Sequence, residues 1–300
     1  MADDLKTTRL GVIPEPPFVM LPDPGAVFDR RAERLRFLAD GSRLGPYLGF
    51  LAQIVACQAV LVRELAPVEP LPEDAVAQAI AGAMPPIDRM GLAEAPDLDA
   101  ILDRLLERVA VVPMPDAADA ARRALAGADR EARTDILAQV LAGEVAGEDA
   151  GPALFAAAAV QVHASRLAAT LDAKHLRPVR VGLCPCCGSR PASSIVVGDK
   201  RAEGARYAAC GICCTLWNEV RIKCLACGTT KGISYRATGE DAVIKAEVCD
   251  ECRSWVKILY ATHDTALEPI ADDVASLGLD ILMADSDWRR AGFDPFLTGV

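Results

Sequence analysis

The fold of this chain is decided by four short cysteine motifs: CPCCG at residues 184–188, CGIC at 210–213, CLACG at 224–228 and CDEC at 249–252. The first and third motifs start 40 residues apart, and the second and fourth start 39 residues apart. The chain therefore contains a repeated unit in which CxxCG is followed, about two dozen residues later, by CxxC. Two residues between cysteines let one tight turn aim both sulfurs at a single ion, and two such turns complete its shell.

The repeat predicts two tetrahedral four-cysteine metal sites, with the four ligands of each site taken from one repeat rather than interleaved between repeats. The predicted ligands are Cys184, Cys187, Cys210 and Cys213 for the first site, and Cys224, Cys227, Cys249 and Cys252 for the second. The pattern is typical of a zinc ribbon or a rubredoxin, and four sulfurs alone do not choose between zinc and iron. A closed shell leaves no position for water, which disfavours metal-assisted hydrolysis.

Other residues of the motifs have a predicted local role. Gly188 and Gly228 follow the first turn of each repeat, where a positive φ is expected to let backbone N–H groups point toward sulfur. Cys186 and Cys214 stand beside ligands, and we interpret them as small apolar fillers, with a redox or alternative-ligand role left open. Cys57, in the N-terminal half, is expected to be a core residue.

Residues 1–178 are expected to form a helical domain, because Ala- and Leu-rich runs alternate there with short breaks at Pro and Gly. The clearest helix covers residues 98–109, where apolar side chains recur at helical spacing and Asp97 is placed to cap the start. Further helical runs are expected at residues 28–39, 46–65, 116–126, 135–142 and 152–173. The uncharged stretch 44–62 approaches bilayer length, but it contains Gly, Pro and Gln, and we interpret it as a buried core helix.

The C-terminal half has a different sequence pattern from the N-terminal half. Alternating apolar and charged residues predict strands at 220–224 and 244–248, and an apolar stripe over residues 270–288 predicts a last helix that packs back on the protein. We therefore predict an α+β protein, with an N-terminal helical bundle, two tandem rubredoxin-like or zinc-ribbon modules and a C-terminal helix. The predicted parts are residues 1–178, 179–222, 223–262 and 263–300.

Composition excludes several classes of function. The 300 residues are 52% hydrophobic and 25% charged, so the chain can bury a core. A formal net charge of −10 argues against nucleic acid or an anionic membrane as partner. Ten of the eleven cysteines lie between residues 184 and 252, which indicates metal binding in a reducing compartment. The first residues lack the layout of a secretory signal, so we expect a cytoplasmic protein without membrane insertion.

Catalytic signatures are missing from the sequence. The histidines, His163, His175 and His263, lie in separate segments without metal-ligand spacing, and we interpret them as structural or surface residues. No nucleophile motif or phosphate-binding glycine loop is present. Asp272, Asp273 and Asp280 share a face of the last helix with Ser276, and the simplest interpretation is a solvated acidic face, with a recognition surface as the alternative.

The C-terminal half resembles the FdhE family, the formate dehydrogenase accessory proteins. The segments that carry the resemblance are CPCCGSRP, RYAACGICCTLWNEVRIKCLACG, KAEVCDECRSWVK and ADDVASLGLDILMADSDWRRAGFDPFL. The N-terminal half is similar to the family more loosely, through RAERLRFLAD and YLGFLAQIVACQ. All eight cysteines that the family pattern requires are present, while Trp255 replaces an expected Tyr and Gly278 interrupts the last helix.

The resemblance implies a cytoplasmic assembly factor, and not an enzyme, that acts on the catalytic subunit of a respiratory formate dehydrogenase before export. It also implies rubredoxin-like sites that hold two metal ions, iron or zinc. The ribbon modules and the last helix are the expected contact surface for the partner. Whether the protein forms a homodimer is left open. A rubredoxin-like iron electron carrier is the alternative function, and a zinc-ribbon nucleic-acid binder is disfavoured by the acidic balance.

Overall fold

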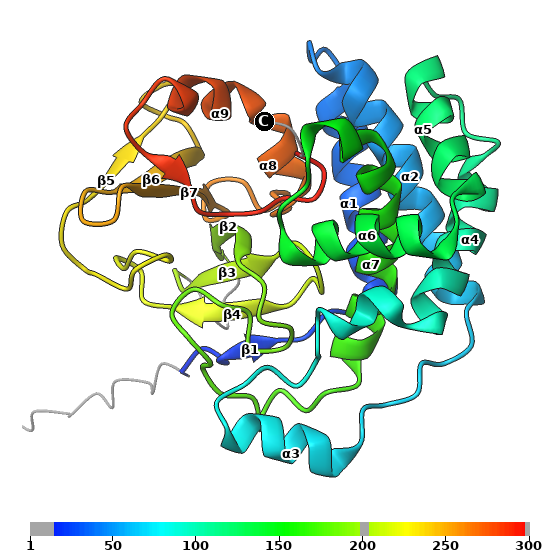
Figure 1. Cartoon of the computed structure of the whole chain (residues 1–300). Coiled ribbons are helices and arrows are strands. Elements are labelled where there is room, and N and C mark those ends of the chain that lie inside the picture. The colour runs from blue at the N-terminus through cyan, green and yellow to red at the C-terminus, as the bar shows by residue number, and fades with distance from the viewer. Residues whose placement is uncertain (1–14, 199–203, 298–300) are drawn as a thin grey trace, which may run out of the picture.

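The computed structural model describes residues 15–198 and 204–297. Within them, the N-terminal half forms a helical body and the C-terminal half forms a β-rich part that lies against one side of it (Figure 1). The predicted α+β class, with helices first and two cysteine modules after them, is confirmed. The boundaries of the individual domains stay a prediction.

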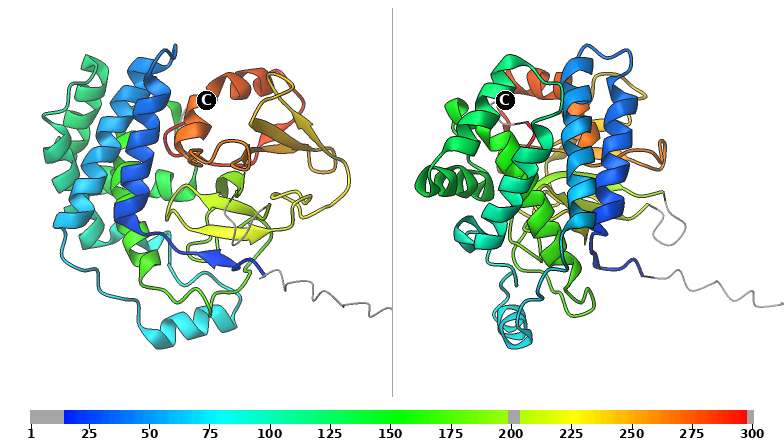
Figure 2. Two further views of the ribbon diagram at one scale, coloured as in Figure 1. Left: turned by 180° about the vertical axis from the view of Figure 1, so that it is seen from behind. Right: turned by 90° about the vertical axis from the view of Figure 1, so that its right-hand side faces the viewer.

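The helical body contains the expected helices and one more. In the described residues they are α1 (Pro24–Ala39), α2 (Gly45–Glu64), α3 (Glu73–Ala81), α4 (Pro96–Val109), α5 (Asp116–Gly127), α6 (Arg130–Ala142) and α7 (Ala150–Ala169), with short 3-10 turns at Gly91–Glu94 and Gly147–Asp149. Each predicted run falls on one of these helices. The helix that the sequence did not predict is α3, which is nine residues long, buries no residue and lies apart from the other helices (Figure 2).

The core of the body surrounds α7, whose alanine-rich sequence lets α2, α4, α5 and α6 approach it closely. The apolar stripe predicted for residues 98–109 is confirmed, because every apolar side chain of that stripe is buried on α4. The predicted cap is wrong. The residue before the helix is Ala95, Pro96 starts the first turn, and Asp97 lies inside that turn without a capping bond.

One described helix, α2, is long and apolar enough to cross a bilayer. Its side chains Leu48, Leu51 and Ile54 are fully buried, and the helix contacts α1, α4 and α7. Cys57 on the same helix is half-buried and packs against the core. These contacts agree with the interpretation of α2 as a core helix of the bundle.

Each cysteine module contributes three antiparallel strands to one sheet. The first module has β2 (Pro191–Val196), β3 (Arg206–Cys210) and β4 (Leu216–Glu219), and the second has β5 (Ile233–Arg236), β6 (Ile244–Cys249) and β7 (Ser254–Tyr260). Parallel pairing of β2 with β7 joins the modules, and β1 (Val19–Met20) adds an edge to β4. The strand order is β1-β4-β3-β2-β7-β6-β5.

One of the two predicted strands is confirmed and the other is wrong. The strand at 244–248 is part of β6, but residues 220–224 lie outside a strand, because the chain leaves the sheet after Glu219. The guanidinium of the buried Arg206 donates to the backbone oxygens of Arg221 and Lys223, at 3.3 and 3.1 Å. These bonds hold the segment as a loop instead of a ladder.

The last helix is broken in two, as α8 (Ala271–Ala275) and α9 (Leu277–Ala284), and is followed by β8 (Arg289–Arg290) on β7. In a continuous helix the carbonyl oxygen of Asp273 would accept from residue 277. Instead it accepts from the Lys257 amine at 2.6 Å and from the Ser276 hydroxyl at 3.1 Å. Both helices pack back on the protein, α8 against α1 and α9 against the sheet of the second module. The predicted apolar stripe is wrong for α9, because its members Ile281 and Leu282 are exposed.

Candidate metal centres

The eight predicted ligand sulfurs lie in two groups, each drawn from one repeat. In the first group the Cys184 and Cys213 sulfurs are 3.6 Å apart, as are those of Cys187 and Cys210. The second group has sulfur separations of 3.6 Å for Cys224 and Cys252 and 3.8 Å for Cys227 and Cys249.

These separations match a tetrahedral thiolate site. Four sulfurs placed about 2.3 Å from a central ion are roughly 3.8 Å from one another. All sulfurs of each group lie within 4.8 Å of each other, so each group could hold a metal ion. The interleaved arrangement does not occur among the residues that the structure describes. Because four sulfurs around an ion leave no position for water, the chemistry that either group supports is structural or electron-transferring.

The turn after the first cysteine pair is the same in both repeats. Gly188 and Gly228 have φ values of 71° and 79°, as expected from the sequence. Their N–H groups, however, donate to the backbone oxygens of Cys184 and Cys224, at 2.8 and 3.0 Å, and not to sulfur. The glycines therefore close the turn, and other backbone groups face the sulfurs.

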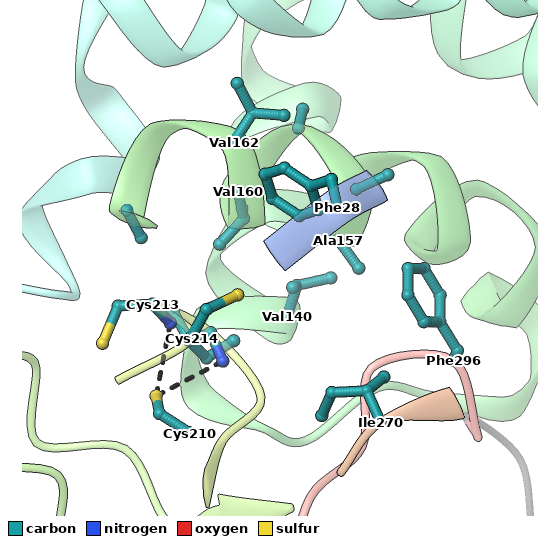
Figure 3. Packing of buried hydrophobic residues seen from close by; sticks show 14 of the residues in the cluster. Phe28, Val140, Ala157, Val160, Val162, Cys210, Cys213, Cys214, Ile270 and Phe296 are labelled. Atoms are coloured by element: carbon teal, nitrogen blue, oxygen red, sulfur yellow. Dashed lines mark hydrogen bonds between the residues drawn. The ribbon is translucent and has the colours of Figure 1, made fainter. Parts of the chain in front are cut away.

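The second turn of each repeat has a shared backbone conformation. In the first repeat, the N–H groups of Ile212 and Cys213 donate to the Cys210 sulfur at 3.4 and 3.2 Å (Figure 3). The turn ends in a left-handed residue that is not glycine in either repeat, with φ of 61° at Cys214 and 53° at Arg253. The two repeats therefore share this unusual backbone conformation as well as their cysteine spacing.

The first site is part of the protein core. All four of its cysteines are at most 1% exposed, and they belong to the hydrophobic cluster that contains residues of α1 and α7. Figure 3 shows Cys210, Cys213 and Cys214 below α7. The Gln161 side chain of α7 donates to the backbone oxygen of Gly211, in the second turn of the site, at 2.8 Å. Burial raises the pKa of the Cys184 thiol well above its usual value.

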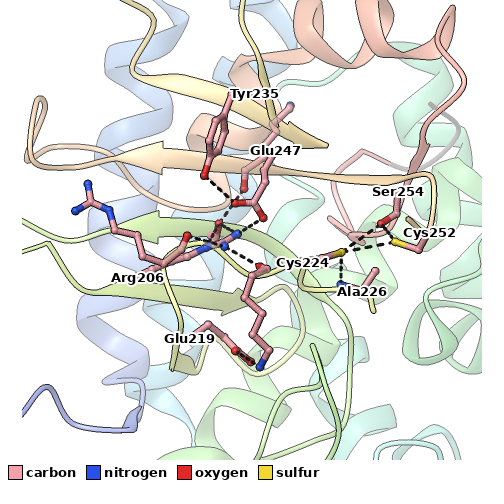
Figure 4. Close-up of polar contacts among 12 residues, drawn as sticks. Arg206, Glu219, Cys224, Ala226, Tyr235, Glu247, Cys252 and Ser254 are labelled. Carbon is pink, nitrogen blue, oxygen red and sulfur yellow. Dashed lines mark hydrogen bonds and ion pairs between the residues drawn. The ribbon is translucent and has the colours of Figure 1, made fainter. Parts of the chain in front are cut away.

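The second site lies at the surface. Cys227 and Cys252 are exposed, while Cys224 and Cys249 are buried. The Ala226 N–H donates to the Cys224 sulfur at 3.3 Å, and the Cys252 sulfur lies 2.9 Å from the Ser254 hydroxyl (Figure 4). Burial disfavours the charged thiolate form of Cys224 and by itself would raise the pKa of that thiol. Hydrogen bonds from the backbone N–H groups of Cys227 and Ala226 act in the opposite direction, and the pKa is lowered to about 7.

The two cysteines beside the first site are buried but are not members of its four-sulfur group. The Cys186 sulfur accepts from the Thr215 hydroxyl at 3.4 Å, and the Cys214 sulfur lies 3.7 Å from the guanidinium of Arg31. Burial raises the pKa of the Cys214 thiol, against the opposing charge of Arg31. Both side chains fill space, as predicted, but each also has a polar neighbour.

The three histidines are structural or surface residues, as expected. His163 is buried on α7, while His175 and His263 are exposed. Among the described residues, none of them belongs to a metal-ligating group.

The acidic face predicted on the last helix is not solvated. Asp272, Asp273 and Asp280 are each at most 4% exposed, which also rules them out as a recognition surface. Arg34 of α1 donates two bonds to Asp272, at 2.9 and 2.8 Å, and Lys257 of β7 pairs with Asp273 at 2.9 Å and with Asp280. The basic partners come from distant segments, so helical periodicity could not reveal them.

Two buried ion pairs that the sequence did not predict hold the cysteine modules in place. Arg31 of α1 pairs with Glu268 at 3.1 Å beside Cys214, and Arg206 of β3 pairs with Glu247 of β6 at 2.8 Å (Figure 4). Both pairs are at most 4% exposed at their side chains. The second pair crosses between the two modules and also fixes the loop at residues 221–223.

Replacing Gly182 with alanine tests the packing of the second site against the segment before the first. A Cβ there would lie 1.6 Å from the Leu225 backbone oxygen, and Gly182 has a φ of +66°. We expect Gly182→Ala to lower the free energy of unfolding by about 2–4 kcal/mol, measured by urea titration. The control, Gly278→Ala, meets no atom within 4 Å on α9 and should add about 0.5–1 kcal/mol. Equal stability of the two variants would contradict the packing described here.

Comparison with known proteins covers nearly the whole chain. Residues 16–181 match the family model described as FdhE, N-terminal, residues 183–221 match FdhE, central domain, and residues 222–297 match FdhE, C-terminal domain. A protein from Rhizobium meliloti (strain 1021) named "Protein FdhE homolog" is 51% identical over 97% of this chain and 96% of its own length. An Edwardsiella ictaluri protein of the same name is 35% identical over 93% of this chain and 91% of its own.

A solved structure has the same fold. The crystal structure of the FdhE protein from Pseudomonas aeruginosa superposes with a TM-score of 0.85 at 30% sequence identity. The match covers 95% of this chain and 99% of that one. The arrangement of helical body, paired cysteine modules and C-terminal helices is therefore shared with an experimentally determined protein.

Proposed function

The chain belongs to the FdhE family of formate dehydrogenase formation proteins, and from this premise we propose that it is a cytoplasmic assembly factor that binds the catalytic subunit of formate dehydrogenase before export. The observation that carries the proposal is the completeness of both four-sulfur groups in a chain that is similar to a family member over 97% of its length. We further propose that these eight cysteines bind two metal ions, iron or zinc, and that the protein is not itself an enzyme.

The structure supports a binding role over a catalytic one. A metal ion in a closed shell of four thiolates shapes the surrounding chain but offers no position to a substrate. The buried ion pairs at the site, Arg31 with Glu268 and Arg206 with Glu247, hold elements together instead of facing a reaction centre. The cysteine modules therefore act as a rigid frame for a contact surface.

The side of α9 that faces away from the sheet is the proposed contact surface. Ile281 and Leu282 are 59% and 60% exposed, whereas Leu279 and Met283 are buried against the strands of the second module. Two adjacent exposed aliphatic side chains on one helix suit a protein partner. The proposal places the contact surface on the last helix, as the sequence suggested, but on its apolar residues and not on its aspartates.

A double substitution on α9 tests this surface. The double variant, Ile281→Asp with Leu282→Asp, is produced in cells that lack the endogenous protein. It should restore at most about one tenth of the formate dehydrogenase activity that the unchanged chain restores, because central apolar contacts dominate binding. Metal content and the circular dichroism spectrum should stay unchanged. Val111→Asp, at a side chain 87% exposed on the helical body, is the control and should restore full activity. Full activity of the α9 variant would remove this assignment.

The exposed second site also favours one alternative, a rubredoxin-like electron carrier. Electron transfer needs a metal close to the surface, and Cys227 and Cys252 are exposed. This alternative predicts a red iron protein that bleaches reversibly on reduction, with a defined potential. A protein that supports enzyme formation when loaded with zinc alone would exclude it, because zinc has no redox chemistry.

A further inference from the structure

The repeat allows the two cysteine sites to be compared position by position. Cys187 and Cys213 of the first site are 1% and 0% exposed, whereas the equivalent residues, Cys227 and Cys252, are exposed. The residues inside the turns differ in the same way: Cys186 is buried where its equivalent, Ala226, is exposed. Two sites with the same ligand set and the same backbone therefore have different access to water.

The first site is also held by side chains that the second lacks. Arg31, Gln161 and the apolar residues of α1 and α7 cover its second turn, and the Ile87 N–H donates to the Cys186 oxygen at 3.0 Å. Opening this site would expose part of the main core. In the second site, the equivalent of the buried Cys214 is Arg253, which is exposed, so one side of the turn faces solvent.

The second site keeps its shape through contacts that do not involve its sulfurs. The backbone oxygen of Arg253 accepts from the Arg289 N–H at 2.8 Å, and the Cys249 backbone pairs with Ser254 across β6 and β7. In the other turn, the Cys224 N–H donates to the Thr229 oxygen at 2.9 Å, and the Leu225 side chain is buried. Both turns are thus anchored to the sheet and to the neighbouring loop.

From these differences we propose that the first site holds a permanent structural ion, while the second site holds an exchangeable ion that can leave and return with the protein folded. The proposal rests on the metal binding proposed above but not on the identity of any partner. Metal leaves a thiolate site when a competing ligand reaches it, so release from the second site needs only local access. Release from the first site requires opening of the core, which has a far larger free-energy cost.

The test is metal release from the full-length protein loaded with zinc at both sites and mixed with excess EDTA. Metal that remains bound is measured over time by mass spectrometry, and the far-UV circular dichroism is followed in parallel. We expect two phases of equal amplitude, with the fast phase about 10- to 100-fold faster than the slow one, since changes around the ligands alter metal binding by such factors. The spectrum should not change during the fast phase, and Zn²⁺ added after the EDTA has been removed should refill the emptied site.

Variants assign the phases. Cys227→Ser should contain one ion and show only the slow phase, with an unchanged circular dichroism spectrum. Ala226→Ser, which alters an exposed position in the same turn and keeps all four sulfurs, is the control and should show both phases. A single release rate in the unchanged protein, or a fast phase that persists in Cys227→Ser, would overturn the inference. If both ions leave at the same rate while the protein still supports formation of formate dehydrogenase, this inference is wrong and the proposed function is not affected.

Discussion

Replacing Cys213 with serine is expected to release the ion of the first site and to unfold the cysteine modules, with loss of their packing against the helical body. A structural ion held by four cysteines contributes an apparent binding free energy of about 10–16 kcal/mol. That is comparable to the total stability of a typical domain, about 5–15 kcal/mol. Cys213 is fully buried within the main hydrophobic cluster, so the disruption cannot stay local.

The matched control for Cys213→Ser is Cys252→Ser, because the two residues are equivalent in the repeat. Cys252 is exposed, and its loss should remove one ion while the helical body keeps its thermal transition. Metal content, circular dichroism and the melting curve of both variants distinguish the outcomes. A Cys213→Ser protein with two ions and an unchanged melting temperature would show that the first group does not hold a structural metal.

Replacing Lys257 with methionine is the second substitution with a large expected effect. The Lys257 amine is fully buried and pairs with Asp273 and Asp280, which also pair with Arg290. A third buried acid of this cluster, Asp294, has its pKa raised well above the usual value by burial and by the charge of Asp273. Although burial opposes ionisation of Asp273, the charges of Arg290 and Lys257 outweigh it and lower the pKa of that carboxyl group. The methionine variant leaves two buried carboxylates with only one cation.

Breaking a buried ion pair from one side costs about 3–5 kcal/mol, because the remaining charge keeps its desolvation penalty. Lys257→Met should lose stability in this range, measured by urea denaturation. Its control is Arg63→Met: Arg63 pairs with Asp29 where both side chains are about half exposed, and its loss should cost less than about 1 kcal/mol. A Lys257→Met protein as stable as the control would contradict the role of the amine in fixing α8 and α9.

The candidate sites could be predicted from the sequence because their chemistry is local. Two residues between cysteines define a turn, and the repeat of that turn is enough to assign each sulfur to its group. The buried stripe of α4 was predictable for the same reason, since helical spacing relates residues within a few turns.

Features that depend on distant segments could not be predicted. The sequence suggested an interruption of the last helix at Gly278, but the break falls at Ser276 and Gly278 lies inside α9. The difference arises from Lys257, which belongs to a strand and takes up the Asp273 carbonyl oxygen. The burial of Asp272 depends on Arg34, more than 200 residues away in the chain. The difference in exposure between the two cysteine sites is of the same kind, because the ligand cysteines of the first repeat belong to the hydrophobic cluster that contains α1 and α7, whereas those of the second repeat do not.

The most direct test of the central claim is anaerobic affinity purification of the tagged protein from cells that express formate dehydrogenase, followed by mass spectrometry of the proteins recovered. We predict that the catalytic subunit is recovered with the unchanged chain and with Val111→Asp, and is lost with the Ile281→Asp and Leu282→Asp double variant. Recovery of other proteins without the catalytic subunit, from the unchanged chain, would contradict the account of this protein as an assembly factor.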